Sequence, residues 1–205
     1  MKKEEISPYT IVIENFQQNI KYDGSQILAH YTAEKHGVLG NSILLFRGNM
    51  ELSPKEMVDI KDVIRESHMA EVLISSDDAL HIIIEEFDIQ PPNLEIVYYR
   101  LRILAQLIIE QLQLKGVEVA REGTDLFINE KKLNVGIATI SQTSCKIHFG
   151  LNYLVTGIPS HVNAIGLKEL GFMEQNLEEW LLTVAKNYIK EISKIKNDIV
   201  KTKPV

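Results

Sequence analysis

The feature that most constrains this fold is a change of pattern at Gly116. Residues 93–116 carry closely spaced apolar side chains together with Arg100 and Arg102, and they end in glycine, which is typical of a helix. This helix is too apolar to lie free on a surface, so we expect it to pack across a sheet. The runs that follow, VEVAR, DLFIN, KKLNVGIATIS and CKIHFGLNY, read as strands separated by turn residues. The sequence therefore predicts adjacent antiparallel strands over residues 117–150, against the helix.

Shorter elements are predicted before this unit. Residues 19–26 favour a short strand and turn, and a helix of about ten residues should follow and end at Gly37. Residues 41–52 favour a buried strand with Arg47 near its end. The SPKEM motif that comes next supplies an N-cap serine and a first-turn proline, which are typical of a helix start.

Two further helices are expected. Residues 71–87 begin as an apolar strand, and the Ser-Ser-Asp-Asp cluster within them is typical of a helix N-cap, which places His81 on a helix. Residues 176–202 are amphipathic with a lysine-rich end, so residues 176–205 should be a C-terminal helix and a fraying tail. Together the elements predict an α+β fold. We expect one domain over residues 1–205, with a mixed, mainly antiparallel sheet flanked by helices.

Composition disfavours several classes of protein. The 205 residues are 45% apolar and 24% charged, which is ordinary for a globular protein. The 28 acidic residues outnumber the 22 basic ones, so we do not expect nucleic acid as a partner. The start lacks a secretion signal, and no run approaches the roughly 18 apolar residues that span a bilayer. We therefore expect a cytoplasmic protein without a membrane partner, and a homo-oligomer is left open.

Asp125, Lys131 and Lys132 form the first candidate site. A β-turn at Asn129 and Glu130 would bring the arms of a hairpin together, and strand alternation should aim the two lysines at opposite faces. One lysine could then enter a cleft and neutralise a carboxylate or phosphate. Alternatively, both are solvated lysines on a polar hairpin, which is the ordinary state of lysine.

His148, Gly150 and Asn152 form the second candidate, in the run His-Phe-Gly-Leu-Asn. Histidine can exchange a proton near neutral pH, glycine permits a close backbone approach, and asparagine offers both a donor and an acceptor. These groups suit a polar ligand, whereas a lone strand histidine is more often a hydrogen-bonded structural residue. Arg47 and Gly48 could likewise hold a carboxylate or phosphate through the guanidinium fork. A surface or fold-stabilising arginine is the alternative.

Other chemistries find little support. Cys145 is the only cysteine, and a spacing of three along a strand should put it on the opposite face from His148. We therefore expect a structural thiol. Four aspartates within residues 59–78 could bind a metal, but two of them look like a helix N-cap, and we expect no metal site. The glycine-rich dinucleotide, P-loop and serine-hydrolase motifs are absent.

Several segments together resemble a known family. They are YDGSQ, SILLFRGNMEL, MVDIKDV, ALHIIIEEFD, GTDLFINEKKLNVGIATIS and IHFGLN. Over most of residues 19–172 they look like the family called domain of unknown function 366. A more distant resemblance is to lipoate/biotin protein ligases and lipoyl-type acyltransferases. It implies a mixed, largely antiparallel sheet flanked by helices.

The resemblance to the ligases also implies roles for residues. Those enzymes carry a hairpin with an aspartate and a lysine, a Gly-x-Ala segment and a strand that contains histidine and glycine. The similar residues here are Asp125, Lys131 or Lys132, Gly136-Ile137-Ala138 and His148-Phe-Gly150-Leu-Asn152. In the ligases the lysine contacts the acyl carboxylate and the adenylate, which is the role implied for Lys131 or Lys132.

The chain also departs from these enzymes. The arginine- and glycine-rich nucleotide loop of the ligases is reduced to Phe46-Arg47-Gly48-Asn49, so the resemblance supports ATP as a cofactor only weakly. Octanoyl transferases carry a nucleophilic cysteine in a Pro-Cys-Gly segment. The comparable residues 158–161 hold no thiol, so a covalent thioester mechanism is not expected.

These residues predict an enzyme that binds a small carboxylate or acyl group and is related to cofactor ligases and acyltransferases. The predicted catalytic residues are Lys131, Lys132 and His148. The predicted substrate-binding residues are Arg47, Gly48, Asp125, Gly136, Gly150 and Asn152. A non-catalytic ligand-binding or regulatory module on the same fold is the alternative, and it explains the reduced nucleotide loop and the missing thiol more simply.

Overall fold

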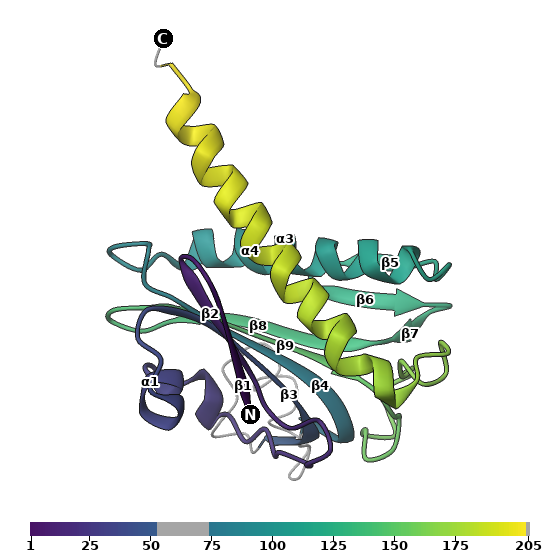
Figure 1. The fold of residues 1–205 in the computed structure, drawn as a ribbon. Helices are drawn as coiled ribbons and strands as arrows, with labels where there is room; N and C mark the ends of the chain where they lie inside the picture. The colour runs from purple at the N-terminus through teal and green to yellow at the C-terminus, as the bar shows by residue number, and fades with distance from the viewer. Residues whose placement is uncertain (53–73, 204–205) are drawn as a thin grey trace.

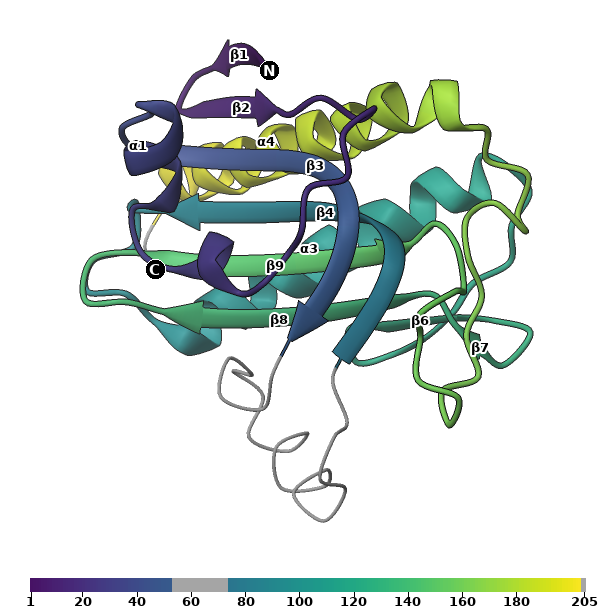
Figure 2. The same cartoon turned by 90° about the horizontal axis from the view of Figure 1, so that it is seen from below.

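A computed structural model describes residues 1–52 and 74–203, and a six-stranded sheet forms their centre (Figures 1 and 2). Its strands lie in the order β1-β2-β3-β4-β9-β8. They are β1 (Lys2–Ile6), β2 (Tyr9–Ile13), β3 (Asn41–Leu52), β4 (Ile74–Glu86), β9 (Cys145–Asn152) and β8 (Asn134–Ile140). β2 and β3 pair in parallel, and the other neighbouring pairs are antiparallel. The sheet is mixed and mainly antiparallel, which confirms the expected α+β class.

Within the residues that the structure describes, a smaller sheet and four helical segments flank the large sheet, and a fifth leads into the last helix. The strands of the smaller sheet are β5 (Ala120–Glu122), β6 (Asp125–Ile128) and β7 (Lys131–Lys132). The long helices α3 (Leu94–Gln113) and α4 (Leu177–Lys201) lie across one face of the large sheet (Figure 1). The short elements η1 (Ser25–Ile27) and α1 (Tyr31–His36) lie on the opposite face (Figure 2), and η2 (Glu174–Asn176) leads into α4.

The face under the two long helices carries the larger core. The side chains that α3 buries recur every three or four residues, as one stripe of a helix does. They include Val97, Leu101, Leu104, Ile108 and Leu112. At the start of α3 the side chain of Asn93 accepts a hydrogen bond from the backbone N–H of Ile96, at 3.0 Å. The helix packs on alternate residues of the sheet, such as Ile84 and Ile147. The predicted helix across a sheet is confirmed.

The opposite face of the sheet carries a smaller core and several buried polar groups. Its apolar residues include Leu44, Phe46 and Ile83, which pack with Tyr22 from the segment before η1. The polar side chains of β4 and β9 that point to this face include His81, Glu85, Lys146 and His148, and each of these is almost fully buried. A sheet face with this many buried titratable groups is a natural place to look for function.

The region of residues 71–87 differs from the prediction. β4 runs unbroken from Ile74 to Glu86, so the expected helix is wrong and His81 lies on a strand. The run from Ile82 to Ile84 explains the difference, because β-branched residues buried on both faces suit a central strand. β4 pairs with β3 on one side and with β9 on the other, which completes its backbone hydrogen bonding.

Other boundaries also shift. Arg47 lies inside β3 and not near its end. The predicted strand over residues 131–141 is interrupted at Leu133, where the chain passes from β7 in the small sheet to β8 in the large one. The helix of about ten residues is instead two short pieces, η1 and α1, although Gly37 ends α1 as predicted, with a φ of 64°. The C-terminal helix is confirmed as α4, and the SPKEM helix falls outside the described residues.

Candidate functional site

Lys132 lies where the small sheet passes into the large one. Asn129 and Glu130 form the predicted turn, and both have left-handed backbone angles, φ 49° and 64°, as a type I′ hairpin requires. The Nζ of Lys132 lies 2.9 Å from Oδ2 of Asp125 on the neighbouring strand. These two side chains are 30% and 35% exposed, so a ligand in solvent can reach them. Among the described residues, none forms an ion pair with the ammonium group of Lys131.

Asn152 holds the backbone on which Lys132 sits. Its side-chain Nδ2 donates to the carbonyl oxygens of Lys132, at 3.4 Å, and Ile165, at 3.3 Å. Its backbone N–H donates to the carbonyl of Leu133, at 2.9 Å, and the N–H of Ile165 donates to the carbonyl of Lys132, at 3.0 Å. Three of the predicted site residues, Asp125, Lys132 and Asn152, are therefore brought together at one end of β9.

The predicted residues of β9 share one face of the sheet with Gly48. Asn152, Gly150 and His148 alternate along the strand, so they point to the same side, away from α3 and α4. The register of β3, β4 and β9 places Gly48 in the same row as Asn152, two strands away. Their backbones are therefore separated by about 10 Å.

Packing within the chain excludes a Cβ at Gly48 and leaves little room for one at Gly136. A Cβ at Gly48 would lie 1.9 Å from the carbonyl oxygen of Ile20, because residues 19–22 run directly against β3. A Cβ at Gly136 would lie 3.2 Å from the ring of Phe149, which belongs to the core on the helix side. Gly136 therefore does not share the face of Gly48, Gly150 and Asn152.

His148 lies in a buried stack of rings. Its Nε2 is 3.1 Å from Nδ1 of His81, whose Nε2 is 3.3 Å from the carbonyl oxygen of Gly48. Since a carbonyl only accepts, His81 donates to Gly48 and accepts from His148. The ring of Tyr22 lies 3.8 Å from that of His148, and the ring of Phe46 lies 4.6 Å from that of His81, each nearly parallel.

Burial keeps both histidines neutral. Removal from water lowers the pKa of His81 to about 4, although the hydrogen bond to Gly48 acts in the opposite sense. Burial, and secondly the neighbouring His81, lower the pKa of His148 well below its usual value. His148 is 2% exposed beneath Tyr22. The part of the predicted site that solvent reaches is therefore the Lys132 end and not the histidine.

A second buried group on this face was not predicted. The Nζ of Lys146 lies 2.9 Å from Oε2 of Glu85, and both side chains are at most 2% exposed. The other oxygen of Glu85 accepts from the hydroxyl of Ser144, at 2.8 Å, and from the backbone N–H of His30, at 2.9 Å. Burial lowers the pKa of Lys146, and Glu85 opposes this shift. The signal in the sequence was the i, i+2 spacing of Lys146 and His148 on one strand face.

Arg47 is already bound by carboxylates. It donates to both oxygens of Asp78, at 2.8 and 2.6 Å, and to Glu174, at 3.3 Å, while its guanidinium lies over the ring of Tyr153. A cavity of about 250 Å³ opens beside it, and Asp77 also lines that cavity. One guanidinium thus faces three carboxylates. A free anion would have to compete with them.

The structure agrees with the expectation for Cys145. The thiol is buried in the core on the helix side, on the face opposite His148, and burial raises its pKa. Across residues 1–52 and 74–203, no group of three or more histidine, cysteine or acidic residues is arranged to hold a metal ion. None of the helices in those residues is long and apolar enough to cross a bilayer.

Comparisons with known proteins assign the chain to a family. The model of the family described as Domain of unknown function (DUF366) matches residues 11–203. The "Uncharacterized protein MJ0805" of Methanocaldococcus jannaschii is 34% identical over 189 residues, which are 92% of this chain and 83% of that protein. A solved "Protein of Unknown Function from Pyrococcus horikoshi" is 36% identical, with a TM-score of 0.86, and the match covers 96% of this chain and 99% of that one.

More distant structures share the fold. The biotin protein ligase from Aquifex aeolicus in complex with biotin and ATP is 15% identical, with a TM-score of 0.57 over 91% of this chain and 72% of that one. A bi-partite lipoate protein ligase from Thermoplasma acidophilum is 9% identical, with a TM-score of 0.56 over 87% and 83% of the two chains. The chain therefore belongs to the DUF366 family and has the fold of the biotin and lipoate protein ligases.

Proposed function

We propose that this protein is a cytoplasmic enzyme that binds a small carboxylate or acyl-bearing ligand and holds its polar end at Lys132. The observation that carries the proposal is the meeting of Lys132, Asp125 and Asn152 at the accessible end of β9. An ammonium group has three N–H donors, and Asp125 takes one of them. The other two remain for a ligand. Hydrogen bonds from Asn152 and Ile165 hold the backbone of Lys132 in place. A fixed donor of this kind can meet a ligand oxyanion with little reorganisation.

The resemblance to the ligases supports the same residue. Biotin and lipoate each carry a carboxylate, and in those enzymes a hairpin lysine contacts the acyl carboxylate and the adenylate. Of the two candidates, Lys132 is the lysine whose ammonium group meets Asp125 and whose carbonyl oxygen accepts from Asn152, so we assign that role to Lys132 and none to Lys131. His148, beneath Tyr22, then supports the strand and does not exchange protons with the ligand.

A binding or regulatory module that uses no nucleotide is the second candidate. It is favoured by the surroundings of Arg47, where Asp77, Asp78 and Glu174 supply three negative charges against one positive charge. Such a cavity repels a triphosphate. In this candidate the carboxylate ligand binds at Lys132 in the same way, but ATP neither binds nor changes the affinity.

A thermal-shift screen with lipoate, biotin, octanoate and ATP tests the proposal. Because a ligand that binds the folded state raises the melting temperature, a selective carboxylate ligand should appear as a concentration-dependent shift. If ATP increases the shift in melting temperature that a carboxylate ligand causes, the result supports the enzyme. If ATP changes neither the melting temperature nor that shift, the result supports the second candidate.

The two neighbouring lysines supply a matched pair of variants. Lys132→Met keeps most of the aliphatic packing and removes the charge. The binding free energy of the carboxylate ligand should therefore weaken by roughly 1.5–3 kcal/mol. Lys131→Met makes the same chemical change on the adjacent residue and should bind as the parent does. If both variants bind the ligand as tightly as the parent protein, Lys132 is not a ligand contact and the assignment is wrong.

A further inference from the structure

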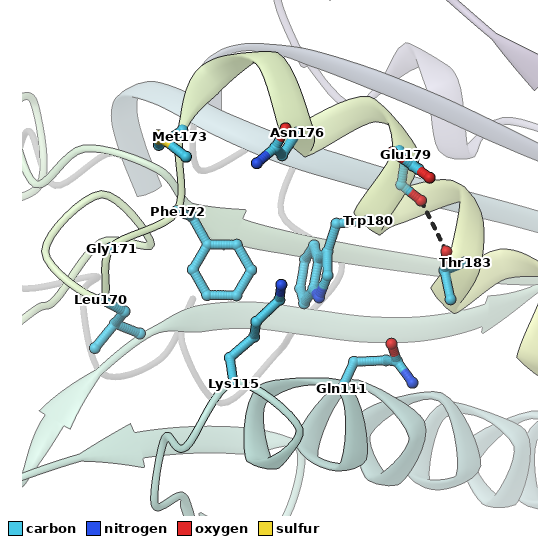
Figure 3. A pocket seen from close by; sticks show the side chains of 10 residues that line it. All are labelled: Gln111, Lys115, Leu170, Gly171, Phe172, Met173, Asn176, Glu179, Trp180 and Thr183. Atoms are coloured by element: carbon cyan, nitrogen blue, oxygen red, sulfur yellow. Dashed lines mark hydrogen bonds between the residues drawn. The ribbon is translucent and has the colours of Figure 1, made fainter.

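A second candidate site lies between the end of α3 and the start of α4 (Figure 3). The cavity has a volume of about 540 Å³, within the range that small molecules occupy. Its lining residues include Lys115, Phe172, Asn176, Glu179 and Trp180. None of the residues that line it belongs to the Lys132 site, so a ligand here would be additional to the proposed substrate.

The indole N–H of Trp180 has no acceptor in the part of the chain that the structure describes. Trp180 is 7% exposed, and its Nε1 is buried without a hydrogen-bond partner in the described residues. Its ring meets the ring of Phe172 edge to face, with 5.0 Å between the centroids and 73° between the planes. Buried donors are nearly always satisfied in folded proteins, so an unpaired N–H beside a cavity indicates a missing acceptor.

Further donors surround the same cavity. Lys115 extends from the end of α3 toward the two rings (Figure 3), is exposed, and forms no ion pair with any residue the structure describes. Asn176 is the N-cap residue of α4, yet its side chain makes no capping bond and stays available. The first turn of a helix also favours negative charge. Glu179 adds one negative charge to the lining, which disfavours a doubly charged anion such as phosphate.

We propose that this cavity binds a small monocarboxylate with a flat apolar body. The apolar body packs on Phe172 and Trp180, and the carboxylate accepts hydrogen bonds from Nε1 of Trp180 and Nζ of Lys115. The exposed Lys115 side chain changes rotamer to let the ligand reach the buried N–H. A carboxylate satisfies both unpaired donors at once, whereas a neutral ligand leaves the lysine unpaired.

Trp180 is the only tryptophan in the chain, so intrinsic fluorescence reports on this cavity directly. We would titrate the full-length protein with 3-phenylpropionate and with its uncharged amide, 3-phenylpropionamide. The carboxylate should give a saturable change in fluorescence, and the amide should bind at least about tenfold more weakly because it lacks the charge-assisted bond to Lys115. No saturable change with the carboxylate, or equal affinity for the amide, overturns the proposal.

Variants separate this site from its surroundings and from the Lys132 site. Lys115→Met should weaken binding of 3-phenylpropionate about tenfold or more, while Lys190→Met, an exposed lysine of α4 outside the cavity, should leave it unchanged. Trp180→Phe keeps an aromatic ring without the N–H and should also weaken binding, as measured by calorimetry. Lys132→Met should not alter the titration, so this proposal and the proposed function can fail independently. Equal affinity in the parent protein and Lys115→Met overturns the cavity proposal.

Discussion

Nη1 of Arg100 on α3 lies 2.7 Å from Oε2 of Glu86 at the end of β4. Glu86 is fully buried, and its other oxygen accepts hydrogen bonds from the hydroxyls of Tyr9 on β2 and Tyr188 on α4. One carboxylate therefore connects β2, β4 and both long helices. Tyr9 and Tyr188 remain protonated because burial, and then the charge of Glu86, raise the pKa of each hydroxyl.

Removing the arginine should destabilise the protein strongly. Arg100→Leu leaves the buried charge of Glu86 without its cation, so the free energy of unfolding should fall by about 3–5 kcal/mol. Urea denaturation at pH 7 measures this value. Arg121→Leu, an exposed arginine of β5, is the control and should change it by less than about 0.5 kcal/mol. Equal midpoints for the two variants would contradict the role of the pair.

Asp88 should make stability depend on pH in the acid range. Burial alone would raise its pKa, but hydrogen bonds from Arg100 and Lys196 lower it to about 2, against 3.8 in the unfolded chain. A lowered pKa stabilises the folded state above pH 3.8, and this contribution is lost as the pH falls through 3.8 toward 2. Asp88→Asn should therefore cost roughly 2 kcal/mol at pH 7. In urea denaturation the variant and the parent should converge near pH 2, and a constant difference down to that pH would contradict the assignment.

His81 and His148 should make stability depend on pH in a higher range than Asp88 does. Their folded pKa values lie below 6.5, so the unfolded chain binds more protons below that pH. Their contribution to the free energy of unfolding is therefore fully present well above pH 6.5. It falls as the pH drops toward the pKa values in the folded state, by up to about 1.4 kcal/mol per pH unit for each histidine. His148→Phe should remove the share of the slope that one buried histidine contributes between pH 6.5 and 5.5 in urea denaturation. His161→Gln, at an exposed position, should keep the full slope, and a full slope in both variants would sink the prediction.

Two glycines should differ sharply in their tolerance of a methyl group. Gly48→Ala places a Cβ 1.9 Å from the backbone oxygen of Ile20, so residues 19–22 must move away from β3. Gly136→Ala meets side chains and no backbone, with the ring of Phe149 nearest at 3.2 Å, so a small shift of that ring can make room. The first change should therefore cost more than about 3 kcal/mol and the second only about 1 kcal/mol, as for overpacking of a core. Similar melting temperatures for the two variants would contradict the close approach of residues 19–22.

The sequence predicted elements whose signals are local. The apolar stripe of α3, the glycine that ends α1 at residue 37 and the turn at Asn129 and Glu130 each depend on neighbours within a few residues, and each is confirmed. The opposite faces of Cys145 and His148 follow from strand alternation alone. The residues that matter in these cases lie close together in the chain.

The predictions were wrong or undecided where residues far apart in the sequence determine the structure. The Ser-Ser-Asp-Asp cluster has the composition of a helix cap, but the pairing of Ser75 and Ser76 with β3 holds it in β4, and Asp78 meets Arg47 from 31 positions away. The choice between Lys131 and Lys132 likewise depends on Asn152 and Ile165, which follow 20 or more residues later. His81 and its partner His148 lie 67 positions apart, so no local pattern could have joined them.

The order of the large sheet leaves β1 as one of its edges. This strand carries four charged residues in succession, Lys2, Lys3, Glu4 and Glu5, and two of them reach α4 through the ion pairs Lys2–Glu178 and Lys186–Glu4. A second chain that added a strand here would have to strip water from these charges before its backbone could pair. The N-terminal strand therefore protects the protein against aggregation along this edge of the sheet.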